Sequence, residues 1–221
     1  MDNWVERYRK PTRILHWIHT AAFVLLFITG LILYLSPLAF LAEDGWTRAI
    51  HRIAVVFFVI APLVYIPMNW KTTVEGVAEA FTWGVADIRW LIAAPSYYFF
   101  SNEKAMPPQG HMNTGQKGWW LVVIVSSIVF IITGAAMWFG KTSAPAPVLQ
   151  WSVFIHDVAF IVSGCMLFLH IYLAVIHPLM RPLRTGSWSS MARGKVSAEY
   201  ARSHHAKWYQ EMSEGHKEVK S

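Results

Sequence analysis

The sequence predicts an all-α integral membrane protein: a four-helix bundle with an amphipathic helix at the inner membrane surface and both termini in the cytoplasm. Two features of the composition carry this prediction. The 221 residues are 55% hydrophobic and only 14% charged, whereas an ordinary soluble domain carries about 25% charged residues. The apolar residues gather in four long runs, and a membrane-spanning helix needs about 20 mostly apolar residues. Such helices satisfy their backbone hydrogen bonds internally, so four of them favour a bundle.

The predicted membrane spans cover residues 12–35, 46–69, 114–139 and 147–177. Basic residues precede the first span, as they precede a signal peptide, but this span is too long and lacks a convincing small-residue cleavage site. We therefore expect it to stay as the first helix. The single cysteine, Cys165, excludes an intrachain disulfide. With a polar tail at 178–221, residues 1–221 are predicted to form one membrane domain.

The connection between the second and third spans, 69–118, is long enough to hold a further helix. Apolar residues recur in it at helical spacing, opposite acidic ones; they are Val74, Val77, Phe81, Val85, Ile88 and Leu91. This pattern predicts an amphipathic helix on the inner membrane surface, and a helix packed on a partner protein is the alternative. The tail is predicted to be partly helical from Ala198 to Met212. We expect its His204 and His205 to be solvated, or to contact a partner or lipid headgroups, rather than to bind a metal.

Lysine and arginine residues are divided unevenly between the two sides of the predicted bundle. Sixteen of the 19 lie in the amino-terminal segment, the long connection and the tail, and the other three are Arg48, Arg52 and Lys141. The positive-inside rule then places both termini of this multi-pass chain in the cytoplasm. The net charge of +6 thus reflects membrane topology, and nothing in the sequence indicates a nucleic-acid partner.

Four histidines lie inside the apolar runs, where a polar ring is costly and indicates function. His156 and His170 are fourteen residues apart on the fourth run, which is nearly four turns and about 21 Å along a helix. Their rings therefore leave one side of that helix at two depths. His16 lies near the inner end of the first run, and His51 opens the second run from outside. Depth pairs His16 with His170 and His51 with His156, as the axial ligands of two stacked b haems.

Two neighbouring histidines compete for the inner haem. His19 is one turn from His16 on nearly the same face, and His177 is two turns from His170. His19 can instead bond a haem propionate or line a quinone pocket, and His177 can be a polar residue at the membrane interface. A weak internal echo, Ile-Thr-Gly at 28–30 and again at 132–134, suits close approach by a flat macrocycle, although ordinary helix packing explains it as well.

The residues around these histidines resemble the cytochrome b (gamma) subunit of membrane-bound respiratory formate dehydrogenase. The resemblance covers nearly the whole chain, and its main stretches are Arg13-Ile14-Leu15-His16-Trp17, Ile50-His51, Asn113-Thr114-Gly115-Gln116-Lys117, Ile155-His156, His170-Ile171-Tyr172, Gly194-Lys195-Val196-Ser197, His204-His205 and Trp208-Tyr209. The histidine pattern alone is shared with cytochromes b of hydrogenases and thiosulfate reductases. The stretch that begins at Asn113 and the tail favour formate dehydrogenase.

The resemblance implies two haem b groups, whose iron ligands would be His16, His51, His156 and His170. It also implies a site for quinone, either menaquinone or ubiquinone, at Asn113, Gly115 and Gln116. Asn113 also suits the N-cap of the third span. The chain would not be an enzyme on its own. It would pass electrons from a periplasmic molybdenum- or tungsten-containing catalytic (alpha) subunit, through an iron–sulfur (beta) subunit, to quinone near the cytoplasmic side. The family also suggests a trimer of heterotrimers.

Two other functions compete with this one. The same cytochrome could anchor a hydrogenase, a thiosulfate reductase or another periplasmic oxidoreductase, because the sequence does not reveal which donor it binds. A histidine-based metal or proton transporter belongs to a different class. Transporters commonly place acidic groups in the membrane, and here Asp157 is the only acidic residue within an apolar run. Asp157 adjoins a predicted haem ligand, which disfavours transport.

Overall fold

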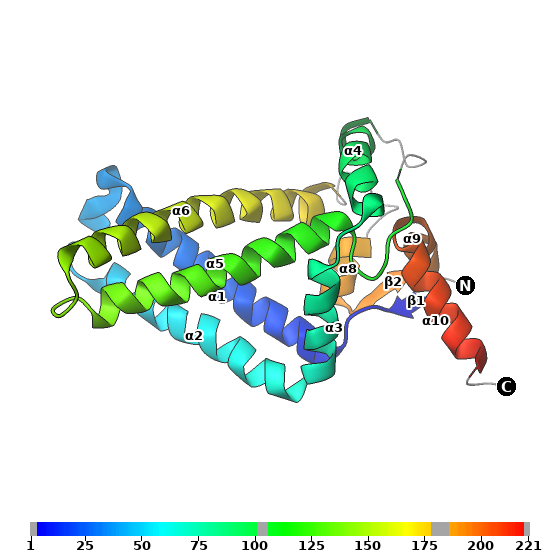
Figure 1. Cartoon of the computed structure of the whole chain (residues 1–221), viewed down its shortest axis with the longest axis horizontal. Coiled ribbons are helices and arrows are strands. Elements are labelled where there is room, and N and C mark those ends of the chain that lie inside the picture. The colour runs from blue at the N-terminus through cyan, green and yellow to red at the C-terminus, as the bar shows by residue number, and fades with distance from the viewer. Residues whose placement is uncertain (1–3, 101–105, 178–185, 219–221) are drawn as a thin grey trace. The chain divides into compact units, whose positions relative to one another are not determined.

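The computed structural model describes residues 4–100, 106–177 and 186–218. Along the chain its elements are β1 (Trp4–Glu6), α1 (Lys10–Tyr34), a 3-10 helix (Ser36–Ala42), α2 (Trp46–Met68), α3 (Trp70–Phe81), α4 (Val85–Phe100), α5 (Thr114–Phe139), α6 (Ala146–Ile171), a π-helical turn (Tyr172–Ile176), α8 (Gly186–Ala192), β2 (Lys195–Ser197), α9 (Ala198–His204) and α10 (Ala206–Glu218) (Figure 1). The helical fold class is confirmed, and the short β1–β2 pair is the one strand element among the described residues.

The chain divides into two compact units, which are described separately. The bundle unit consists of Ile14–Trp70 and Val122–Phe168. The tail unit consists of Met1–Arg13, Lys71–Leu121 and Leu169–Ser221. The bundle unit therefore holds most of α1, α2, α5 and α6 and the 3-10 helix, and the tail unit holds the shorter α-helices and the two strands.

Four helices are long and apolar enough to cross a membrane: α1, α2, α5, and α6 with its π-helical turn. All four predicted spans are thus present, and each begins and ends within two residues of the prediction. Large apolar side chains such as Phe57, Ile132 and Phe154 remain exposed on them. Lipid tails would cover such side chains, which is why a spanning helix stays apolar on its outer faces.

An aromatic cluster links α1 to α6 in the bundle unit. The ring of Phe27 stacks on Phe160 with centroids 5.2 Å apart, and it meets Phe168 edge-on at 5.6 Å. Gly164 admits this ring, because a Cβ there would lie only 2.6 Å from Phe27 Cε2. A small residue therefore lets these two helices approach each other through an aromatic side chain.

The tail unit is organised around the antiparallel pair β1–β2, in which Val5 lies opposite the fully buried Val196. Gly194, just before β2, has φ of +81°, and its carbonyl accepts the backbone N–H of Arg7 at 2.8 Å. The Arg13 side chain donates to the carbonyls of Met191 and Ala192 at the end of α8. These contacts attach the amino-terminal segment and the start of α1 to the carboxyl-terminal tail.

The long connection contains two helices, α3 and α4, where the sequence predicted one amphipathic helix. The prediction of a single continuous helix was therefore wrong. The break falls at 82–84. The Trp83 Nε1–H donates to the Ala80 carbonyl at 2.9 Å and closes the end of α3. Gly84 donates its N–H to Asp87 Oδ2 at 2.9 Å, directly before the start of α4. Local side-chain caps therefore end one helix and begin another inside a single amphipathic pattern.

The tail is helical where predicted, as α9 and α10, but His205 between them is not solvated. Its side chain is 1% exposed, and its Nδ1 lies 2.9 Å from the Gly110 carbonyl, to which it donates. Burial, together with the nearby Arg7 guanidinium, holds the pKa of His205 well below its ordinary value of 6.5. His204 meets the Tyr97 hydroxyl at 2.5 Å through Nε2. Both histidines thus bond within the chain, and the residues described contain no cluster of three metal-binding side chains.

Candidate haem and quinone sites

The bundle unit brings together the two histidines predicted for the outer haem. His51 lies on α2 and His156 on α6, and their rings are near enough to interact electrostatically. Nδ1 of His51 lies 2.8 Å from the Thr29 hydroxyl on α1, and Nδ1 of His156 lies 2.8 Å from the Thr133 hydroxyl on α5. Both rings are thus held through Nδ1, and Nε2 is the ring atom left to bind iron. This donor set fits bis-imidazole ligation of a haem.

Each of these threonines is followed by a glycine beside the ring. A Cβ at Gly134 would lie 3.7 Å from His156 Cε1, and one at Gly30 would lie 3.9 Å from His51 Cε1. The Gly30 position is also tight against Phe160, whose Cε2 would be 3.3 Å from that Cβ. The repeated Ile-Thr-Gly stretch therefore supports two histidines on neighbouring helices, a role that the sequence echo alone did not reveal.

His19, which competes with His16, is engaged by a backbone carbonyl. Its Nε2 lies 2.8 Å from the Phe58 carbonyl, and its ring stacks on the Phe58 ring with centroids 4.3 Å apart. Residue 62, four positions further along α2, is a proline with no N–H to donate to this carbonyl. In hydrocarbon such a carbonyl needs another donor, and the His19 ring supplies one. This arrangement explains His19 as a structural residue.

His16 is in a different situation within the same unit. Its Nδ1 is buried and has no hydrogen-bond partner among the residues described. In this respect it differs from His51 and His156, whose Nδ1 atoms each have a threonine hydroxyl as partner. The contrast with His19 favours His16 as the ligand on α1.

The other predicted inner ligand, His170, belongs to the tail unit. Its ring stacks on Trp119 with centroids 4.4 Å apart and planes 10° apart. A π-helical turn, Tyr172–Ile176, follows directly, and such turns often occur at functional sites. His177 is buried among the rings of Tyr98 and Tyr172, whose centroids lie 5.1 and 6.3 Å from its own. The pairing of His16 with His170 stays a prediction from the sequence.

Asn113 and Gln116, predicted at the quinone site, form a reciprocal cap at the start of α5. The Asn113 N–H donates to Gln116 Oε1, and the Gln116 N–H donates to Asn113 Oδ1, both at 2.9 Å. This is a capping box, so the N-cap interpretation of Asn113 is confirmed. A Cβ at Gly115 would lie 3.0 Å from Trp90 Cη2. Gly115 therefore admits the Trp90 indole beside the cap, and the quinone role of all three residues stays a prediction.

A small open hollow lies beside this cap in the tail unit. Its lining includes three aromatic side chains and three polar ones: Trp90, Tyr97, Tyr98, Gln109, Asn113 and His204. Aromatic walls with a few convergent amide and imidazole groups suit a flat ring that carries carbonyl oxygens. Asn113 is the one predicted quinone residue in this lining, and spacing along the chain does not reveal that α4 and His204 lie beside it.

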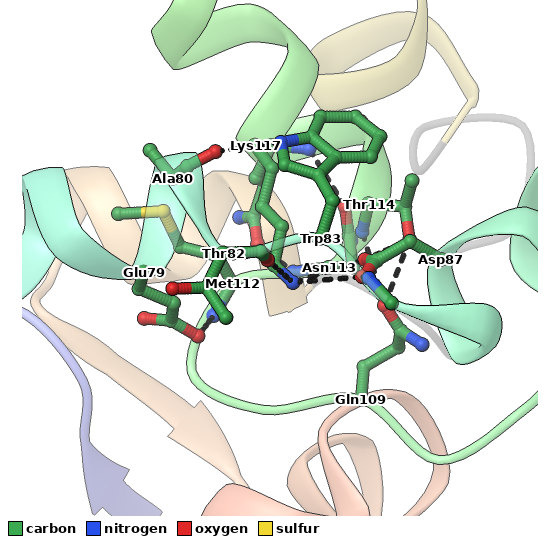
Figure 2. Close-up of polar contacts among 12 residues, drawn as sticks. Glu79, Ala80, Thr82, Trp83, Asp87, Gln109, Met112, Asn113, Thr114 and Lys117 are labelled. Carbon is green, nitrogen blue, oxygen red and sulfur yellow. Dashed lines mark hydrogen bonds and ion pairs between the residues drawn. The ribbon is translucent and has the colours of Figure 1, made fainter.

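A buried ion pair anchors the same helix start (Figure 2). Lys117 Nζ lies 3.0 Å from Asp87 Oδ1, which also accepts the Thr114 hydroxyl at 2.8 Å. The Thr114 N–H donates to Gln109 Oε1 at 3.0 Å. Burial opposes ionisation of Asp87, but the hydrogen bonds from Lys117, Gly84 and Thr114 outweigh it and lower the pKa of this carboxyl. The network fixes α4 and the loop before α5 against the start of α5.

A family model for prokaryotic cytochrome b561 matches residues 7–194 of the chain. The chain belongs to the prokaryotic cytochrome b561 family. A formate dehydrogenase cytochrome b556 subunit of Haemophilus influenzae is 26% identical over 216 residues, covering 95% of this chain and 84% of that protein. The nitrate-inducible formate dehydrogenase cytochrome b556(Fdn) subunit of Escherichia coli K12 is 26% identical over 211 residues, covering 94% and 91%.

The cytochrome b556(fdo) subunit of Escherichia coli K12 formate dehydrogenase is similar at 25% identity over 215 residues, covering 94% of this chain and 93% of that protein. The resemblance found in the sequence is therefore confirmed at modest identity over most of the chain. As a cytochrome b561 family member with four apolar helices, the chain is a multi-pass membrane protein of electron transport, and haem b is the cofactor that the family implies.

Proposed function

We propose that the chain is the di-haem b subunit of a quinone-linked formate dehydrogenase. The observation that carries the proposal is the pair His51 and His156, each held through Nδ1 by a threonine hydroxyl at 2.8 Å. Formate would be oxidised on another subunit, and this chain would transfer the electrons. Its relatives are named as formate dehydrogenase subunits, and these names favour a formate dehydrogenase as the electron donor. The proposed partners are an iron–sulfur subunit and a molybdenum- or tungsten-containing catalytic subunit.

The proposed ligands are His51 and His156 for the outer haem, and His16 and His170 for the inner one. The engagement of His19 Nε2 by the Phe58 carbonyl supports this choice, because it leaves His16 as the other histidine of α1. When bound, haem b would supply one-electron transfer between the two sides of the membrane. The distribution of basic residues supports an inner-membrane chain with both termini in the cytoplasm.

The proposed quinone site is the hollow beside Asn113, on the cytoplasmic side. Asn113 caps α5 with its oxygen, Oδ1, so its Nδ2 amide group is the donor that it can offer to a quinone carbonyl. Gln116 does not line the hollow, but it likewise uses Oε1 for the cap and keeps its amide group as a donor near the hollow's edge at Asn113. Capping and quinone binding therefore use different atoms of the same side chains, and substitutions can separate them.

Replacing Asn113 with serine tests the quinone role without removing the cap. Serine is as good an N-cap as asparagine, but it lacks the amide donor. Loss of a hydrogen bond to a buried carbonyl typically costs about 1–3 kcal/mol, so quinone affinity or turnover should fall roughly five- to 150-fold. Gln116→Glu should act in the same direction, since a carboxylate keeps the capping oxygen. The measurement is the rate at which quinone reoxidises reduced haem in the purified complex.

Both haem spectra and the thermal unfolding midpoint should be unchanged in Asn113→Ser. The matched control is Asn113→Ala, which removes both cap and donor, and which should lose stability by about 1 kcal/mol as well as quinone reactivity. Unchanged quinone kinetics in Asn113→Ser and Gln116→Glu would leave these residues as a helix cap only.

The choice of donor is tested on the complex purified through a tag on this chain. Formate should reduce the haem bands of that complex, and a menaquinone or ubiquinone analogue should reoxidise them. Reduction by hydrogen, or reoxidation by thiosulfate, in a complex that formate leaves oxidised would assign the chain to another oxidoreductase.

A further inference from the structure

We propose that Thr29 and Thr133 are positioning residues that fix the tautomer of His51 and His156 and keep the reduction potential of the outer haem low. This inference rests on the proposed function, in which these two histidines bind the haem iron. The two threonine hydroxyls would not bind the iron themselves. They would act on it through the imidazole rings of His51 and His156.

The direction of the threonine–histidine hydrogen bonds follows from a count of hydrogens. A threonine hydroxyl has one hydrogen to donate and two lone pairs to accept with. The Thr29 hydroxyl donates to the Leu25 carbonyl at 2.7 Å, and the Thr133 hydroxyl donates to the Val129 carbonyl at 2.6 Å. Since that hydrogen is used within each helix, the same oxygen must accept from the histidine ring. The hydrogen bond therefore runs from Nδ1–H of the ring to the threonine oxygen.

This direction fixes the tautomer of both rings. A neutral imidazole carries one hydrogen, and when Nδ1 holds it, Nε2 holds the lone pair that binds a metal. Metal-binding histidines usually donate their second N–H to an acceptor, which sets the tautomer and ring orientation and raises the basicity of the ligand. His51 and His156 each have such an acceptor at 2.8 Å. Both therefore present Nε2 as the basic atom.

The two contacts repeat one device on different helix pairs. A threonine on α1 supports the histidine on α2, and a threonine on α5 supports the histidine on α6. Thr29 and Thr133 are 4% and 5% exposed. In the hydrocarbon region water is not available to replace the hydroxyl as acceptor. Removal of either hydroxyl would thus leave Nδ1–H without its partner.

A more basic ligand stabilises ferric iron relative to ferrous iron, so the threonines would lower the reduction potential. A threonine whose hydroxyl bonds only to a carbonyl of its own helix would not change the reduction potential of the haem. Ser152 provides the comparison, because its hydroxyl donates to the Val148 carbonyl at 2.8 Å one turn before His156. The contact of Thr133 with His156 Nδ1 is what distinguishes it from Ser152.

The test compares Thr29→Val and Thr133→Val with Thr29→Ser and Thr133→Ser, in the complex purified with its partner subunits. Valine keeps the volume and removes the acceptor, whereas serine restores the acceptor. We expect each valine variant to shift one of the two haem components to a higher midpoint potential in an optical redox titration. Haem affinity should fall about 10- to 100-fold, as for other partners of metal ligands. The serine variants and Ser152→Ala should match the wild type.

Failure of this inference is distinguishable from failure of the proposed function. Valine variants with unchanged potentials and haem content, beside a wild type with two haem components, would overturn the threonine role and leave the ligand assignment intact. A wild type without haem, or with one component, would contradict the proposed function itself. If a valine variant does not accumulate, Thr29→Cys or Thr133→Cys takes its place, because a thiol is a weaker acceptor than a hydroxyl. A cysteine variant at the wild-type potential would then overturn the inference.

Discussion

Substitution of His51 or His156 with alanine is expected to remove one haem b per chain completely and to leave the other haem in place. Each ring is the proposed ligand on one side of the outer haem, and each is held through Nδ1 by its own threonine. Loss of one of two axial ligands removes the main attachment of a haem that has no covalent link. The ratio of haem to chain, measured as the pyridine haemochrome, should fall from two to one. The remaining redox component should keep its midpoint potential.

The same substitutions on the inner side distinguish ligands from their neighbours. His16→Ala and His170→Ala should each remove the other haem. His19→Ala should keep both haems but lose about 1–3 kcal/mol of stability, because the Phe58 carbonyl opposite Pro62 loses its donor. His19→Gln, which retains a donor amide, is the matched control. Loss of a haem in His19→Ala or His177→Ala, but not in its neighbour's variant, would move the assignment to that histidine.

The second large effect is expected at the buried ion pair of the tail unit. Asp87→Asn should destabilise the protein by about 3–5 kcal/mol, since it leaves the Lys117 ammonium buried without its carboxylate. The side chains of Lys117 and Asp87 are only 12% and 7% exposed. Glu79 lies within electrostatic range of Lys117, so we expect the lower part of that range. Chemical unfolding in detergent, followed by helical circular dichroism, measures this loss.

The double variant Asp87→Asn, Lys117→Met provides the control, because removal of both charges is often neutral or stabilising. Its stability should return most of the way to that of the wild type. The pH dependence has a defined sign. The pKa of Asp87 is lowered from 3.8, so the pair's contribution is complete above about pH 3.8 and is lost as the pH falls through the folded value. Equal stability of Asp87→Asn and the wild type at neutral pH would show that the pair contributes nothing.

The membrane helices could be predicted closely because their signal is long and local. Apolar runs of more than twenty residues leave little freedom for where a span begins and ends, and α1 and α5 begin and end within two residues of the prediction. The surface connection was harder, because its apolar periodicity continues through the break at 82–84. Side-chain hydrogen bonds of Trp83 and Asp87 cap the two helices at that break. The spacing of apolar residues contains no information about such caps.

The sequence proposes the histidines of the candidate site, and these stay a prediction, but it does not reveal what surrounds them. His205 could not be identified as buried, because its partner Gly110 lies 95 positions away in the chain. The cap at Asn113 could be predicted from the sequence, because its partner Gln116 lies within one helical turn. The Thr133–His156 contact depends on how two helices face each other, which spacing along one helix does not determine.

The number of haem groups per chain tests the central claim most directly. The measurement is the pyridine haemochrome content of the purified complex against the amount of this chain, combined with a dithionite-reduced minus oxidised spectrum. We predict two b haems per chain, two redox components, and full release of the pigment into acid acetone, since no Cys-x-x-Cys-His motif is present for covalent attachment. A ratio near one, or haem that stays on the protein after extraction, would contradict the account.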